Sequence, residues 1–104
     1  MADWFVYMVR CSNNALYTGI TTDVERRAAE HRARTRKAAR YIRFSTSVEL
    51  AYQVRLGTRS LAARAEYRIK QLAKADKETI AREAYSRRRL LRFLKMTFPE
   101  PDTE

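Results

Sequence analysis

Two short runs of strand-forming residues at the start of the chain lead directly into a run that favours a helix. Residues 4–10 are rich in aromatic and β-branched side chains, residues 15–19 form a second such run, and Ser-Asn-Asn between them is typical of a tight turn. Residues 23–35 contain no glycine or proline, and Thr22 followed three residues later by Glu25 predicts a capping box. We therefore expect a β-hairpin followed at once by a helix.

The remainder of the chain predicts one more strand and three more helices. Residues 48–54 favour a strand, and Gly57 with Thr58 favours a turn after it. Ser60 and Ser86 are suited to cap helices, because a serine side chain accepts a hydrogen bond from a free N–H of the first helical turn. Helices are expected over residues 60–73, 76–84 and 86–96. The apolar face of the first of these comprises Leu61, Ala65, Ile69 and Leu72.

Length and charge indicate one domain with a polyanionic partner. A chain of 104 residues favours a single domain, here residues 1–98, with an acidic tail at 99–104. The formal net charge is +10, and the first 98 residues hold 22 basic against nine acidic residues. Such a surface favours polyanions, because their binding releases condensed counterions. The expected partner is nucleic acid, with DNA favoured.

The cysteine content and the N-terminal residues favour a cytoplasmic protein. Cys11 is the single cysteine, which excludes an intramolecular disulfide and a cysteine-based zinc site. The chain starts with neither a basic nor an apolar leader segment, and no stretch approaches the roughly 20 apolar residues that span a bilayer. Secretion and membrane insertion are therefore not expected.

Arg27 and His31 lie four residues apart in the first predicted helix, so both project from one face. A guanidinium offers paired hydrogen bonds to phosphoryl oxygens and stabilises charge that builds on phosphorus. A histidine titrates near neutrality and can relay a proton. Each residue also has an ordinary interpretation, Arg27 as a solvated helix charge and His31 as a structural side chain.

Two tyrosines and one glutamate complete the candidates. Tyr7 and Tyr17 could act as general bases if neighbouring cations lowered the cost of deprotonation, although strand tyrosines commonly serve packing. Glu66 lies near Arg64 and Arg68 and could balance their charge. Alternatively, it could be the one protein ligand of a hard cation such as Mg²⁺, which often uses only one or two carboxylates.

As a set, these residues resemble the GIY-YIG nuclease superfamily, named after two tripeptides on adjacent strands of a hairpin. The corresponding tripeptides are Phe5-Val6-Tyr7 and Tyr17-Thr18-Gly19. Residues 20–31 look like the family's first helix, and residues 65–72 look like its glutamate-bearing helix. The likeness covers about residues 3–80, and it is especially close to small single-domain bacterial members that lack a DNA-targeting module.

The chain departs from the family pattern in two places. Phe5 and Val6 stand where the first tripeptide has glycine and isoleucine. The family's late asparagine has no evident counterpart, because the only asparagines, Asn13 and Asn14, lie in the predicted turn.

The resemblance implies an α+β fold in which a three-stranded antiparallel sheet is flanked by helices. It implies that Glu66 holds one Mg²⁺ or Mn²⁺, that Arg27 braces the scissile phosphate, and that a tyrosine helps to activate water, with Tyr7 favoured over Tyr17. Gly19 would let the backbone turn closely at the site. The catalytic set on one concave face would be Tyr7, Tyr17, Arg27, His31 and Glu66.

We therefore expect a metal-dependent DNA endonuclease, a hydrolase that uses one metal ion. Tyr41 or Phe44 could stack on an unpaired base, which would favour single-stranded or branched DNA. The alternatives are a non-catalytic nucleic-acid-binding protein of the same fold and a protein-interaction module that uses the C-terminal helix. The pathway, repair or recombination among others, and the choice between monomer and weak homodimer stay open. The residues expected to bind nucleic acid are Gly19, Arg26, Arg32, Arg34, Arg36, Lys37, Arg40, Tyr41 and Arg43.

Overall fold

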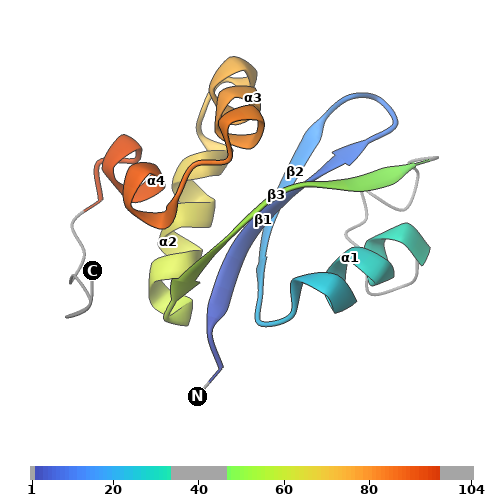
Figure 1. Ribbon diagram of the computed structural model, residues 1–104. Helices are drawn as coiled ribbons and strands as arrows, with labels where there is room; N and C mark the ends of the chain where they lie inside the picture. Colours follow the sequence, from blue (N-terminus) through green and yellow to red (C-terminus); the bar gives the residue numbers. More distant parts are fainter. Residues whose placement is uncertain (1, 34–46, 97–104) are drawn as a thin grey trace.

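Figure 1 shows the computed structural model of the chain, which describes residues 2–33 and 47–96. Within them, three strands and four helices form the α+β fold expected from the sequence. The expected acidic tail at 99–104 and most of the basic residues expected to bind nucleic acid lie outside the described residues. The elements are β1 (Trp4–Cys11), β2 (Leu16–Thr21), α1 (Val24–Ala33), β3 (Val48–Gly57), α2 (Arg59–Lys70), α3 (Lys74–Glu83) and α4 (Arg87–Phe93).

The sheet has the order β2-β1-β3, and its central strand β1 runs antiparallel to both neighbours. The predicted hairpin turn is confirmed. Asn14 has a φ of 68°, a left-handed conformation that asparagine tolerates better than most residues, and its N–H donates to the Cys11 carbonyl over 2.8 Å. The side-chain oxygen of Asn13 accepts a hydrogen bond from the Ala15 N–H at 3.1 Å.

Two strands extend beyond their predicted ends. β2 continues to Thr21, and β3 continues to Gly57. Gly19 was expected to end its strand, but it lies inside β2, opposite Tyr7 of β1. Glycine weakens an isolated strand. Here hydrogen bonds between β2 and the central strand β1 stabilise the extended backbone before and after Gly19, so the strand continues through it.

The predicted capping box at the start of α1 is wrong by one residue. Asp23, rather than Thr22, caps the helix, because its Oδ1 accepts a hydrogen bond from the Arg26 N–H at 3.1 Å. The Asp23 N–H in turn donates to Thr21 Oγ1 over 3.1 Å. The last residue of β2 and the first helical turn are therefore joined through one aspartate.

A similar shift of the cap occurs at α2, while the cap of α4 is as predicted. Thr58 Oγ1, rather than Ser60, accepts a hydrogen bond from the Leu61 N–H at 3.1 Å. Ser86 Oγ accepts one from the Arg89 N–H at 3.2 Å, which confirms it as the cap of α4. Helices α2 and α4 end earlier than expected, and α3 starts two residues earlier.

The helices lie on both sides of the sheet, with α1 on one side and α2, α3 and α4 on the other (Figure 1). Side chains along β1 alternate between the two sides, as expected for an extended strand. Val6 and Met8 belong to the large apolar core under α2, α3 and α4. Tyr7 and Val9 belong to a smaller cluster that includes Val24 of α1. The central strand thus supplies both cores.

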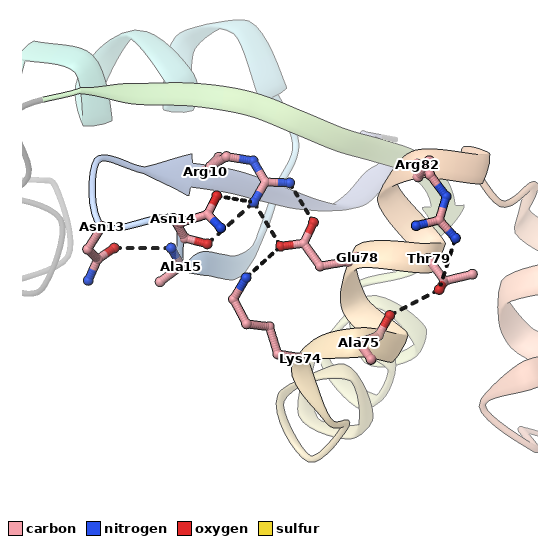
Figure 2. A network of polar contacts seen from close by, with 9 residues as sticks. All are labelled: Arg10, Asn13, Asn14, Ala15, Lys74, Ala75, Glu78, Thr79 and Arg82. Atoms are coloured by element: carbon pink, nitrogen blue, oxygen red, sulfur yellow. Dashed lines mark hydrogen bonds and ion pairs between the residues drawn. The ribbon is translucent and has the colours of Figure 1, made fainter.

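A polar network ties the hairpin to α3 on the larger side (Figure 2). The Arg10 guanidinium donates to both carboxylate oxygens of Glu78, at 2.8 and 2.6 Å, and to the side chain of Asn14 at 3.1 Å. Lys74 Nζ lies 2.8 Å from the same carboxylate. Hydrogen bonds from Arg10 and then Lys74 lower the pKa of the Glu78 carboxyl to about 2. The network stays ionised at neutral pH and aligns α3 with the turn.

Across residues 2–33 and 47–96, none of the helices combines the length and the apolar character needed to cross a bilayer.

Candidate active site

Tyr7 and His31 form a buried hydrogen-bonded pair between β1 and α1. Tyr7 is 2 % exposed and His31 0 % exposed, and Tyr7 Oη lies 2.9 Å from His31 Nε2. The contact is long-range, because 24 residues separate Tyr7 from His31 in the sequence. His31 Nδ1 is buried without a hydrogen-bond partner among the described residues. Among the described residues, the hydrogen bond with Tyr7 is therefore the one that orients the imidazole ring.

Gly19 makes the room that the Tyr7 ring occupies. The two residues are paired across the β1–β2 ladder, and a Cβ on Gly19 would lie 2.5 Å from Tyr7 Oη. No side-chain carbon fits at that distance, so any other residue would displace the phenol. Gly19 was expected to allow a close backbone turn. It serves instead as a mid-strand gap, and its φ is not left-handed.

Arg27 lies one helical turn before His31 and joins the pair from the same helix. Its Nη1 is 2.8 Å from Glu30 Oε1, and its side chain is about one quarter exposed. Its guanidinium also interacts with the Tyr7 phenol and opposes the rise in the pKa of that phenol that burial causes. The shared helix face predicted for Arg27 and His31 is thus confirmed, and both residues reach the same tyrosine.

Burial determines the protonation of the pair. Desolvation raises the pKa of the Tyr7 phenol above its ordinary value, although Arg27 counteracts it. Desolvation, with the Arg27 charge as a smaller contribution, lowers the pKa of His31 to about 4. At neutral pH both side chains are therefore uncharged and Arg27 carries the positive charge of this group.

Tyr17 and α2 close the other side of the group. The Tyr17 ring meets the His31 ring edge-on, with centroids 5.7 Å apart. Lys70 Nζ lies 5.8 Å from the Tyr17 ring centroid and 3.2 Å from Glu66 Oε2. Burial is the main cause of the raised pKa of the Tyr7 phenol, and the charge of the nearby Glu66 carboxylate is a smaller contribution in the same direction. The structure therefore brings together all five predicted catalytic residues, from β1, β2, α1 and α2.

Glu66 is a suitable ligand for a hard cation that needs few protein ligands. Its side chain is 23 % exposed, and its carboxylate faces a lysine rather than a second acid. Among residues 2–33 and 47–96 no group of three or more histidine, cysteine, aspartate or glutamate side chains could enclose a metal. The donor set fits one Mg²⁺ or Mn²⁺ held by one carboxylate, with water and substrate oxygens as its other ligands.

Apart from Gly19, which lies inside β2, the residues expected to bind nucleic acid fall into two groups. Arg26 and Arg32 are exposed on α1, the helix that also carries Arg27 and His31. The other residues expected to bind nucleic acid lie outside the described residues, namely Arg34, Arg36, Lys37, Arg40, Tyr41 and Arg43.

Two charged residues of this site were missed in the sequence analysis. Glu30 pairs with Arg27 at a spacing of three residues, and Lys70 pairs with Glu66 at a spacing of four. These spacings bring side chains together on a helix and were visible in the sequence. What the sequence did not reveal is that Lys70 also lies against Tyr17 from another element.

The chain is similar to several known proteins. The family model described as "GIY-YIG catalytic domain" matches residues 3–80. The UPF0213 protein YhbQ of Escherichia coli O157:H7 is 46% identical over 95 residues, which cover 91% of this chain and 93% of that protein. The YhbQ protein of Shigella boydii serotype 18 is 49% identical over 83 residues, covering 80% and 81% of the two chains.

A solved structure is also similar. The solution NMR structure of the UPF0213 protein BH0048 from Bacillus halodurans has a TM-score of 0.51 and 29% sequence identity. The match covers 91% of this chain and 99% of that one. Together, the matched family model, the YhbQ relatives and the shared fold show that the chain belongs to the GIY-YIG family, whose domain indicates a nuclease.

Proposed function

We propose that this protein is a metal-dependent DNA endonuclease that hydrolyses phosphodiester bonds with one Mg²⁺ or Mn²⁺ ion. One observation carries the proposal: Tyr7 forms a hydrogen bond with His31 and lies within the electrostatic influence of Arg27 and Glu66. A phenol, an imidazole, a guanidinium and a carboxylate supply proton transfer, phosphate binding and cation binding in one place. A purely structural cluster has no need of all four.

The Tyr7–His31 pair supports a proton relay during hydrolysis. Water attacks phosphorus and the bond from phosphorus to the leaving oxygen breaks. The proton of the water passes to Tyr7 Oη as the phenol passes its own proton to His31 Nε2. Tyr7 stays neutral throughout, so the high cost of a buried phenolate is avoided. His31 receives one proton per turnover and returns it to the leaving oxygen or to solvent.

Arg27 and Glu66 would deal with the charge of the phosphate. The Arg27 guanidinium remains positive and can donate to the non-bridging oxygens as charge builds in the transition state. A cation held by Glu66 supplies further positive charge beside the scissile phosphate. Arg26 and Arg32, which are exposed on α1, the helix that also carries Arg27, would bind the phosphate backbone of the DNA.

The experiment is cleavage of labelled single-stranded, duplex and forked DNA in Mg²⁺, Mn²⁺ or EDTA. Metal-dependent cutting is expected, with single-stranded or branched DNA preferred. Glu66→Gln should lower the rate by about 10²- to 10³-fold, because it removes the cation ligand. Glu83→Gln is the matched control, since Glu83 is also a helical, ion-paired glutamate but lies on α3.

Tyr7→Phe tests the relay separately from the metal. The rate should fall by about 10²- to 10⁴-fold while Mn²⁺ affinity stays unchanged, because the substitution removes only the hydroxyl. Salt-sensitive DNA binding without cutting on any substrate would contradict the nuclease proposal. That result would favour a non-catalytic nucleic-acid-binding protein with the same fold.

A further inference from the structure

Lys70 is the one ammonium group that the described residues place against both the carboxylate and a tyrosine of the site. It lies in the last turn of α2, one turn after Glu66, with Nζ 3.2 Å from Glu66 Oε2. The same Nζ lies 5.8 Å from the centroid of the Tyr17 ring, on β2. Lys70 therefore touches the site from its solvent side, where it is 46 % exposed.

The Lys70 ammonium group lies beside the carboxylate oxygen to which a metal cation would bind on Glu66. An ammonium ion 3.2 Å from a carboxylate oxygen opposes the negative charge of that carboxylate. A divalent cation that binds this oxygen must displace the ammonium or bear its repulsion. The lysine and the metal therefore compete for Glu66.

A substrate phosphate could bind Lys70 once the lysine is displaced from Glu66. Within residues 2–33 and 47–96, Glu66 is the only carboxylate that forms an ion pair with it. Its flexible stem lets the ammonium move while the Tyr17 ring still attracts it. A phosphodiester that lies between Arg27 and a cation on Glu66 would bring non-bridging oxygens within its reach.

We propose that Lys70 is the counter-ion of Glu66 in the metal-free site and transfers to the substrate phosphate when a divalent cation takes the carboxylate. The inference rests on the proposed function. Its consequence is positive coupling: the metal frees a phosphate-binding group, and bound phosphate keeps that group away from the metal site. By linkage, each ligand raises the affinity of the other by the same factor.

The test measures binding rather than turnover. Mn²⁺ affinity is determined by calorimetry for the full chain, alone and with a nuclease-resistant phosphorothioate oligonucleotide. Lys70→Met should bind Mn²⁺ alone about two- to fivefold more tightly, the range expected for removing one exposed ion-pair partner. The gain in oligonucleotide affinity on adding Mn²⁺ should shrink by a similar factor. Lys70→Arg, which keeps the charge, should restore most of the coupling.

Lys74→Met is the matched control. Lys74 makes the same kind of ion pair with a glutamate four residues away, is similarly exposed at 55 %, and lies on α3 outside the site. It should change neither Mn²⁺ affinity nor the coupling. A merely structural role for Lys70 would make the two methionine variants alike, which would overturn the inference.

The outcomes separate this inference from the proposed function. If Glu66→Gln leaves Mn²⁺ binding as in the wild type, the metal site itself is wrong and both proposals fail. If Glu66→Gln abolishes binding but Lys70→Met changes neither Mn²⁺ affinity nor coupling, only the role of Lys70 is overturned. Tighter Mn²⁺ binding together with weaker coupling in Lys70→Met would support it.

Discussion

The two sides of the sheet differ in what they bury. On the side of α2, α3 and α4 the core is large and almost wholly apolar, with Ile69, Ile80 and Leu91 fully buried. On the side of α1 the cluster is small and includes the buried phenol of Tyr7, which forms a hydrogen bond with the buried imidazole of His31. The side with α2, α3 and α4 therefore supplies most of the hydrophobic stabilisation, and the side with α1 holds polar groups whose burial is costly.

The candidate active site lies where these two sides meet, at the β2 edge of the sheet. Tyr7 and His31 belong to the smaller side, while Glu66 and Lys70 come from α2 on the larger side. The lysine reaches Tyr17 on β2, which is the edge strand. Strand β1 contributes side chains to both cores. The large apolar core can therefore fix the position of Tyr7, which lies on the opposite side of the same strand.

The largest effect on stability is expected from the apolar side. Leu91→Ala removes a fully buried side chain of α4 and should lower the free energy of unfolding by about 2–5 kcal/mol. Cleavage per folded molecule should be unchanged, because α4 contributes no residue to the site. Urea unfolding and cleavage assays on the same sample measure both. Arg92→Ala, an exposed change on the same helix, should stay within about 0.5 kcal/mol.

A loss of cleavage in Leu91→Ala at a concentration where the protein is folded would contradict the separation of the two sides. It would mean that packing around α4 sets the geometry of the site.

An intermediate effect is expected from pH on the polar side. Burial lowers the pKa of His31 to about 4 in the folded protein, whereas an unfolded histidine titrates near 6.5. The unfolded state therefore binds the proton more readily, and stability is full above pH 6.5 and is lost as the pH falls toward 4. Between pH 7 and pH 5 the loss should amount to about 1–2 kcal/mol.

Urea unfolding at the two pH values measures this contribution. His31→Gln cannot titrate, so its stability should change less over the same interval than that of the wild type. An equal change in both proteins would show that His31 is not the group responsible.

The smallest effect is expected from the Arg10–Glu78 pair that ties the hairpin to α3 (Figure 2). Both side chains are partly exposed, at 31 % and 26 %, so Arg10→Met should cost about 1 kcal/mol or less. Because the pKa of Glu78 is lowered to about 2, the contribution is present above its ordinary value near 4.5 and is lost as the pH falls toward 2. A double-mutant cycle with Glu78→Gln isolates the pair. A coupling energy above about 3 kcal/mol would contradict the prediction that the Arg10–Glu78 pair contributes little to stability.

Local features of the fold were predictable where the signal was unambiguous. The Asn13-Asn14 turn and the Ser86 cap were both predicted and confirmed. The caps of α1 and α2 were placed wrongly, because several cap-forming residues stand next to one another there. Which of them caps depends on where the preceding strand ends, and strand ends are determined by pairing with β1.

The resemblance implied that the catalytic residues share one face, but it did not predict which of their side chains contact one another. The helical spacing of Arg27 and His31 was sufficient to place them on one face, because that relation is local. The partnership of Lys70 with Tyr17 had no counterpart in the sequence, because the two residues lie on different elements.

By itself, the sequence determined the order and type of the elements, the hairpin turn and the side chains available for chemistry, because these depend on neighbours a few residues apart. Only the tertiary structure decided that Tyr7 meets His31 across 24 residues and that Gly19 makes room for the phenol. It also decided that Glu66 and Lys70 lie beside β2. The physical reason is that strand pairing and core packing bring distant residues together, while local conformational preference acts only within a turn or two of the chain.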